Sequence, residues 1–245
     1  MSHRPRKRFG QNFLHDQHVL DRIVAAADLQ KEDRILEIGP GPGALTTRLL
    51  ATGLPVLAVE IDRDLAAALQ ARNEADLDVK IGDVLRFDWA DLLQKPPYKM
   101  IANLPYNISS QILFKALDHR HSFTRLVLMF QKEVGDRLVA QEGSRSYGIL
   151  SVLMQTWFHI ERVVKVPPGA FFPPPKVDSV VLRLDPLSEP RVTLQDEDLY
   201  RKLVKSAFAQ RRKTVRNSLL GSGWLAEPID RAFDEAGIDP RSEEH

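Results

Sequence analysis

Short apolar runs alternate with amphipathic segments along the first 140 or so residues of the chain. In the amphipathic segments the apolar residues recur at helical spacing, whereas the runs have the length of buried strands. The expected strands cover residues 35–39, 56–61, 79–81, 100–102 and 126–130. The expected helices cover residues 16–29, 64–73, 109–119 and 132–141, with another that ends near residue 51. This alternation predicts an α/β fold with a mostly parallel, doubly wound sheet and helices on both faces.

The pattern is less regular beyond residue 147. A helix is expected to extend to about residue 158. Strands are expected at residues 163–166 and 177–184, and the second of these is predicted to lie at the edge of the sheet.

The chain has 245 residues, enough for one large domain and a small one. A proline-containing stretch at residues 185–190 has the composition of a linker. We therefore expect a large domain at residues 1–185, which includes an N-terminal arm at 1–16, and a small helical domain at 186–245.

Composition excludes several classes of site. The chain contains no cysteine, which excludes disulfides, thiolate nucleophiles and cysteine-based metal centres, and we expect no metal ion. No apolar run approaches the ~18 residues of a membrane span. The basic N-terminus lacks the apolar stretch of a secretory signal. We therefore expect a cytoplasmic protein without a membrane partner.

Positive charge is concentrated in two places, although the net charge is only +1. Four basic residues crowd the N-terminus: Arg4, Arg6, Lys7 and Arg8. Residues 199–226 contain no acid and seven basic residues: Arg201, Lys202, Lys205, Arg211, Arg212, Lys213 and Arg216. Such blocks often contact phosphate, whereas a solvated helix face is the simpler interpretation of a block taken alone.

A glycine-rich loop, EIGPGPGA at residues 37–44, joins the first expected strand to a helix. Its glycines allow a tight turn and the close approach of a ligand. The pattern suits a dinucleotide, S-adenosylmethionine or merely a tight connection. Pro40 and Pro42 lack the amides that bind pyrophosphate, and Glu37 repels phosphate but suits an ammonium group. These features disfavour a dinucleotide.

Four residues fall at the carboxyl ends of successive expected strands, namely Gly39, Glu60, Asp83 and Asn103. They are 21, 23 and 20 residues apart, about one βα unit each. Ligands bind at this edge of an open α/β sheet, so we expect the four residues to share one cleft. Glu60 is placed to accept hydrogen bonds from ribose hydroxyls, and Asp83 one from an adenine amine. A helix N-cap role is the competing interpretation of each acid.

The tetrapeptide Asn103-Leu104-Pro105-Tyr106 suits methylation of an exocyclic amine on a base. Such a nitrogen is a poor nucleophile because its lone pair is delocalised into the ring. The Asn103 side-chain oxygen and the Leu104 carbonyl are predicted to accept both amine hydrogens, which favours a pyramidal nitrogen. Tyr106 offers a flat face on which the base stacks, worth ~1–3 kcal/mol. An ordinary Asn/Pro turn is the alternative.

Phe172 is a second candidate for stacking on the base. It precedes three prolines at residues 173–175, which hold the loop extended with little entropy to lose. We expect it to face the base opposite Tyr106. The alternative is a linker that packs Phe171 and Phe172 into the core.

Together these motifs resemble those of the ribosomal RNA adenine N6-dimethyltransferases, most closely the bacterial small-subunit enzymes. The resemblance covers residues 10–217 and rests on segments 11–14, 37–43, 59–60, 82–83, 103–109 and 171–179. It implies a Rossmann-like class I methyltransferase domain that uses S-adenosylmethionine. It also implies transfer of two methyl groups to each of two adjacent adenosines in a 3′-end hairpin of small-subunit rRNA, during ribosome biogenesis. The expected partner is the immature subunit, approached by a monomer whose C-terminal helical domain helps it dock.

The resemblance also assigns roles to single residues. The expected cofactor-binding residues are Asn12, Leu14, Glu37, Gly39, Gly41, Glu60, Asp83 and Asn103. The expected catalytic residues are Asn103, Leu104, Tyr106 and Phe172. RNA binding is expected of Arg4, Arg6, Lys7, Arg8, Arg211, Arg212, Lys213 and Arg216.

Three alternatives stay open at this point. The large-subunit adenine methyltransferases that confer antibiotic resistance share most of these motifs, although Leu104 and residues 107–110 favour the small-subunit enzymes. An assembly factor whose methylation is incidental or lost is the second alternative. An NAD-dependent oxidoreductase, suggested only by the glycine loop, is the third.

Overall fold

A computed structural model describes residues 11–210 and 212–241, which divide into two compact units. One unit contains the described residues up to Gly135 together with Phe158–Pro186. The other contains Asp136–Trp157 and the described residues from 187 onward. The unit boundary near residue 186 coincides with the expected linker, but residues 136–157 group with the C-terminal helices instead of the sheet. The assignment of methyl transfer to the first domain and of docking to the second stays a prediction.

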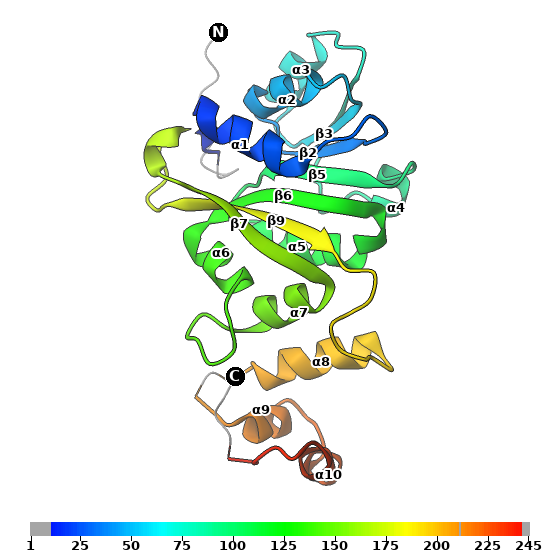
Figure 1. The fold of residues 1–245 in the computed structure, drawn as a ribbon, viewed down its shortest axis with the longest axis vertical. Coiled ribbons are helices and arrows are strands. Elements are labelled where there is room, and N and C mark those ends of the chain that lie inside the picture. Colours follow the sequence, from blue (N-terminus) through cyan, green and yellow to red (C-terminus); the bar gives the residue numbers. More distant parts are fainter. Residues whose placement is uncertain (1–10, 211, 242–245) are drawn as a thin grey trace. The chain divides into compact units, whose positions relative to one another are not determined.

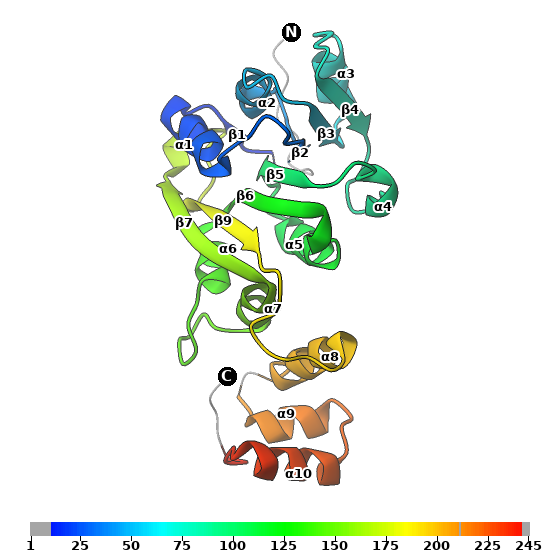
Figure 2. The same cartoon turned by 45° about the vertical axis from the view of Figure 1, so that its right-hand side comes forward.

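The first unit is built on a seven-stranded sheet with the order β4-β3-β2-β5-β6-β9-β7 (Figures 1 and 2). The strands are β2 (Ile35–Ile38), β3 (Val56–Glu60), β4 (Leu77–Ile81), β5 (Tyr98–Asn103), β6 (Phe123–Gln131), β7 (Phe158–Val166) and β9 (Ser179–Pro186). From β4 to β6 neighbouring strands run parallel, and β9 is antiparallel to both β6 and β7. The predicted α/β class with a mostly parallel sheet is confirmed.

Helices cover both faces of this sheet. Figures 1 and 2 show the first three helices on one face and α4 and α5 on the other. The helices are α1 (Gln17–Ala27), α2 (Ala44–Leu50), α3 (Arg63–Gln70), α4 (Trp89–Leu92), α5 (Ser109–Asp118) and, after β6, α6 (Lys132–Leu138), with a 3₁₀ turn at Arg120–Ser122. Leu20 and Ile23 of α1 are almost fully buried and belong to the same apolar cluster as Ile101 and Val127 in the centre of the sheet. Burial of this apolar stripe holds α1 on the sheet.

The expected edge position of the strand at residues 177–184 is wrong. β9 pairs with β6 on one side and β7 on the other, so it lies inside the sheet, and β7 is the edge strand at that end of the sheet. The first residues of β9 are buried on both faces, as an interior strand requires. The edge strand instead carries exposed charged residues such as Glu161 and Arg162, which discourage pairing with another chain.

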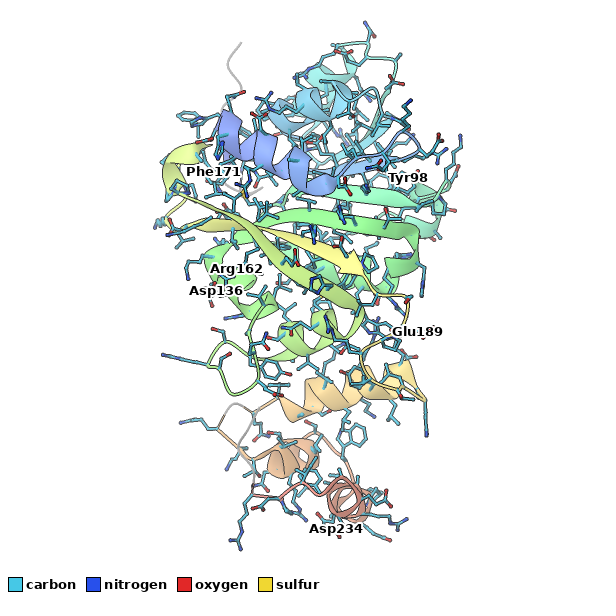
Figure 3. The ribbon with its side chains drawn as sticks, in the orientation of Figure 1. Tyr98, Asp136, Arg162, Phe171, Glu189 and Asp234 are labelled. Carbon is cyan, nitrogen blue, oxygen red and sulfur yellow. The ribbon has the colours of Figure 1, made fainter. Side chains whose placement is uncertain are left out.

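A small two-stranded sheet joins the N-terminal segment to a distant part of the chain. β1 (Phe13–Leu14) pairs antiparallel with β8 (Phe171–Phe172), which follows a 3₁₀ turn at Pro168–Ala170. Phe13 lies opposite Phe172, and Leu14 lies opposite Phe171. Figure 3 shows Phe171 at one end of the strands and Tyr98, the first residue of β5, at the other.

The second unit is helical. Its helices are α7 (Ile149–Trp157), α8 (Glu197–Ala207), α9 (Val215–Gly221) and α10 (Ala226–Ala236). Leu219, Ile229 and Phe233 form its apolar cluster. The hydroxyls of Thr156 and Tyr200 lie 2.8 Å apart and connect α7 to α8. Among the helices in the described part of the chain, none has both the length and the apolar character needed to cross a membrane.

Gly135 lets α6 approach β9 closely. A Cβ atom at this position would overlap Cγ1 of Val180, which is 3% exposed. Gly135→Ala is therefore expected to lower the free energy of unfolding by ~1–3 kcal/mol, the usual cost of overpacking a buried site. Urea denaturation measures this change.

Two further variants separate overpacking from a general effect of removing a glycine. Nothing lies within 4 Å of a Cβ built on Gly169, so Gly169→Ala is the matched control and should change stability little. Adding Val180→Ala to Gly135→Ala should recover part of the loss. The overpacking argument would be contradicted if the double variant lost more free energy of unfolding than the sum of the losses in the two single variants.

Candidate active site

A cavity lies at the carboxyl ends of the parallel strands β2, β3, β4 and β5, where such folds bind ligands. Its walls are the segment at residues 11–14, the glycine loop after β2, the ends of β3 and β4, and the turn after β5. The structure brings together in this cavity all the expected cofactor-binding residues: Asn12, Leu14, Glu37, Gly39, Gly41, Glu60, Asp83 and Asn103. It also brings Leu104 and Tyr106 there.

The glycine loop has no free amide to offer a pyrophosphate between residues 39 and 43. The amide of Gly39 donates to the Val59 carbonyl at 2.9 Å, that of Gly41 to Glu60 at 3.0 Å, and that of Gly43 to Pro40 at 3.0 Å. The two prolines between them have no N–H. Gly41 and Gly43 have φ values of 58° and 91°, which favour glycine. This geometry disfavours a dinucleotide, as the sequence predicted.

Glu60 connects two loops of the cavity. Its Oε2 accepts the hydrogen bond from Gly41, and its Oε1 accepts one from the Asp62 amide at 2.8 Å. Burial raises the pKa of Glu60, and these backbone hydrogen bonds oppose the shift. Since each carboxylate oxygen has two lone pairs, acceptor capacity remains for a ribose hydroxyl. The N-cap of α3 is Asp62 rather than Glu60.

Asp83 lies two residues beyond β4. Its Oδ1 accepts a hydrogen bond from the Leu85 amide at 3.0 Å. Its Oδ2 is 3.7 Å from Nε of the exposed Arg86, longer than a hydrogen bond. The side chain therefore stabilises a local turn and keeps an oxygen for a further donor.

Glu37 is a buried carboxyl group in the wall of the cavity. It is 1% exposed, and its Oε2 has no hydrogen-bond partner among the described residues. Burial raises the pKa of Glu37 to about 8; the nearby Glu60 adds to the shift, while Thr46 and the Arg72 guanidinium oppose it. A buried acceptor without a partner costs free energy, so it marks a place where a cationic donor from a ligand would bind favourably.

The turn after β5 lies directly beside the glycine loop. A Cβ built on Gly39 would lie 3.5 Å from Cδ and Cγ of Pro105. Nδ2 of Asn103 donates to the Asn12 carbonyl at 3.1 Å, which fixes the amide so that Oδ1 is its remaining acceptor. Leu104 is 1% exposed and lines the cavity, and no hydrogen bond to its carbonyl is found among the described residues. Two acceptors are therefore presented at this turn.

The two candidate stacking residues differ in their environments. The Tyr106 hydroxyl is 2.6 Å from Oγ of Ser179 at the start of β9, which holds the ring in place. Burial raises the pKa of this Tyr106 hydroxyl. Phe172 is 64% exposed, whereas Phe171 is 2% exposed and packs in the core. The core-packing alternative therefore holds for Phe171 only, and Phe172 stays available although it is not among the cavity-lining residues.

The structure separates the candidate RNA-binding residues into groups. Arg4, Arg6, Lys7, Arg8 and Arg211 lie outside the described residues. Arg212 and Lys213 are exposed. Arg216 is held by Asp230, with Nε and Nη2 donating to the two carboxylate oxygens at 2.6 and 2.8 Å. A forked pair of this kind ties α9 to α10 and makes Arg216 the least available of the described candidates.

Sequence reasoning assigned no role to several residues that line the cavity, among them Phe13, Gln11 and Ile61. Phe13 lies against Gly41, where an added Cβ would approach its ring to 3.1 Å. Gln11 donates to Oδ2 of the buried Asp62 at 3.2 Å, and Ile61 lines the wall beside it. The segment at residues 11–14 was the available signal, because the resemblance had already assigned Asn12 and Leu14 to the cofactor.

Solved structures show which class of protein has this architecture. The chain matches a dimethyladenosine transferase from Plasmodium falciparum with a TM-score of 0.75 and 31% identity, covering 93% of this chain and 83% of that one. It matches the 23S rRNA methyltransferase ErmE with a TM-score of 0.71 and 29% identity, covering 94% and 92%. The fold and the cavity thus define a class I methyltransferase.

A family model described as ribosomal RNA adenine dimethylase matches residues 2–237, and the chain belongs to that family. A relative from Syntrophotalea carbinolica is 63% identical over 240 residues, which are 98% of this chain and 91% of the relative. Another from Geobacter metallireducens is 49% identical over 244 residues, covering 97% and 89%. Both relatives are named ribosomal RNA small subunit methyltransferase A.

Proposed function

We propose that this protein uses S-adenosylmethionine to dimethylate the N6 amines of two adjacent adenosines in a 3′-end hairpin of small-subunit ribosomal RNA. The observation that carries the proposal is the position of the 103–106 turn against the glycine loop in one cavity. The names of the similar small-subunit methyltransferases support the choice of RNA. The proposed partner is the immature small subunit in the cytoplasm, bound by one copy of the chain.

The cavity suits the cofactor group by group. The unpartnered Oε2 of Glu37 suits its amine, Glu60 suits its ribose, and Asp83 suits its adenine amine. Asn12 and Leu14 cover one side of the same cavity. When bound, the cofactor supplies a methyl group on a sulfonium sulfur.

The protein's part in the reaction is to prepare the acceptor amine. Oδ1 of Asn103 and the Leu104 carbonyl accept the two N6 hydrogens, which draws the nitrogen lone pair out of conjugation and aims it at the methyl group. Tyr106 and Phe172 hold the base on its two faces. The target base has to leave its stack to reach the cavity, at least cost where it lies in a loop. The methylated amine carries a positive charge and loses a proton readily, so no strong base is required.

Methyl transfer to isolated subunits tests this function. The protein is incubated with labelled cofactor and with either immature small or immature large ribosomal subunits that lack the modification. We expect label only in small-subunit RNA. Label only in large-subunit RNA would favour the function of ErmE and contradict the proposal. No label in either RNA, with intact subunit binding, would favour an assembly factor.

Arg212 and Lys213 are expected to contribute to RNA affinity through release of counterions. Replacing both with glutamine should weaken binding to the small subunit and reduce the slope of log K against log salt by about 1.4 to 1.8, because each phosphate contact contributes about 0.7–0.9. Filter binding at several salt concentrations measures the slope.

Arg231 provides a matched control for this slope. It is exposed on α10 and pairs with Glu227 at 3.0 Å. Arg231→Gln removes a positive charge from the same unit and should leave the slope nearly unchanged. An unchanged slope in the Arg212/Lys213 variant would mean that these two side chains face only solvent.

A further inference from the structure

Lys115, in the last turn of α5, reaches the loop that follows β4. Its Nζ donates to the Leu85 carbonyl at 3.0 Å and to the Phe87 carbonyl at 2.5 Å. The same nitrogen lies 5.7 Å from the ring centre of Trp89, at cation–π distance. One ammonium group from the helix layer therefore holds two carbonyls and a ring of this loop.

The loop that Lys115 holds is the one that carries Asp83. The Asp83 carboxylate accepts from the Leu85 amide, and its carbonyl accepts from the Arg86 amide at 2.9 Å. In addition, Nε1 of the fully buried Trp89 donates to the Val84 carbonyl at 3.0 Å. The residues that directly follow Asp83 are thus held by two neighbouring donors, the indole at Val84 and the Lys115 ammonium at Leu85 and Phe87.

Lys115 is not among the described residues that line the cavity, whereas Gly82, Asp83 and Val84 are. Any effect of Lys115 on a ligand therefore passes through this loop. A lysine suits the task because an ammonium is a compact charge with several donors that serve separate carbonyls. Without it, the Leu85 and Phe87 carbonyls would lose this donor, and the indole N–H would be the remaining side-chain donor to the described residues 84–87.

We propose that Lys115 is a positioning residue that fixes the Asp83 carboxylate for the exocyclic amine of the bound purine, and so sets the preference of the site for adenine over hypoxanthine. This inference rests on the proposed function, because it requires a nucleoside cofactor with its base at Asp83. Loss of Lys115 is predicted to change the ratio of the affinities for an adenine ligand and a hypoxanthine ligand, and not to weaken both ligands equally.

Calorimetry with two ligands tests the proposal. S-adenosylhomocysteine carries the purine amine, and S-inosylhomocysteine has a carbonyl oxygen in its place. The wild-type protein should prefer the adenine ligand by about tenfold, as expected for a hydrogen bond to a charged group. Lys115→Met keeps the apolar stem and removes the donors. It should weaken the adenine ligand about tenfold, change the inosine ligand little, and bring the ratio of the two affinities near one.

A second variant at Lys115 and a control variant at another lysine complete the test. Lys115→Gln retains a donor and should give an intermediate ratio. Lys80→Met is the matched control, because Lys80 lies on the exposed β4 edge and pairs with Asp78 at 2.9 Å, and its ratio should equal that of the wild type.

Three outcomes would overturn the proposal. Wild-type affinities for both ligands in Lys115→Met would show that Lys115 does not position Asp83. Equal weakening of both ligands would show a purely structural role for Lys115. Both of these results leave the proposed function intact, whereas wild-type protein that binds neither ligand would overturn the proposed function as well.

Discussion

Replacing Asn103 with alanine is expected to lower the rate of methyl transfer about a hundredfold to a thousandfold, comparable to the loss of a preorganised polar group in other active sites. The variant loses the Oδ1 acceptor and also the Nδ2 donor that holds the Asn12 carbonyl. Binding to the small subunit should be nearly unchanged, because that affinity depends mainly on phosphate contacts elsewhere. Single-turnover methylation and filter binding, performed on the same preparation, separate the two effects.

Two other variants identify what Asn103 contributes. Asn103→Asp keeps an acceptor oxygen but places a carboxylate against the Asn12 carbonyl, so it should retain more activity than alanine while weakening the cover formed by residues 11–14. Asn107 is exposed in the same turn and does not line the cavity, which makes Asn107→Ala the matched control. Wild-type turnover in Asn103→Ala would contradict the assigned role of the amide.

Replacing Glu37 with glutamine is expected to remove a pH dependence from the stability of the free protein. The folded protein retains a proton on Glu37 that the unfolded chain has lost, because burial raises the pKa from 4.5 to about 8. The free energy of unfolding therefore falls as pH rises through this range and levels off above it, by up to ~5 kcal/mol. Urea denaturation between about pH 5 and about pH 8 should show this decline in the wild type and a flatter profile in the variant.

The same group should make cofactor binding pH-dependent in the opposite direction. A ligand amine binds the carboxylate form of Glu37, so the affinity for S-adenosylhomocysteine should rise by up to ~tenfold per pH unit below pH 8. 5′-Methylthioadenosine lacks the amine and should not show this rise. Glu37→Gln should weaken the first ligand far more than the second. A parallel loss of both would contradict the pairing of Glu37 with the amine.

The sequence was enough to predict that four residues at the ends of successive strands meet in one cavity, namely Gly39, Glu60, Asp83 and Asn103. Strands of a parallel sheet place their carboxyl ends along the same edge, so a spacing of one βα unit is enough to bring such residues together. Each of them lies at the end of its strand or within two residues of it, and all four line the cavity. Their individual contacts with a cofactor stay predictions.

Other features depend on contacts that no local pattern reveals. β1 and β8 have two residues each, and their pairing joins Phe13 to Phe172 across most of the chain. Pairs so short leave no periodicity to detect. Similarly, a count of basic residues predicts a patch that includes Arg216, but it cannot show that Asp230 holds its guanidinium. No sequence pattern pointed to Lys115, because its hydrogen-bond partners are backbone carbonyls, which every residue type carries.

A crystal structure of the protein with S-adenosylhomocysteine tests the central claim most directly, because that claim concerns where a methyl donor meets its acceptor. Our account predicts the sulfur atom beside the Asn103 side chain, the ligand amine at Glu37, the ribose at Glu60 and the base at Asp83. A ligand bound outside this cavity, or bound in it with the sulfur turned away from Asn103, would contradict the account.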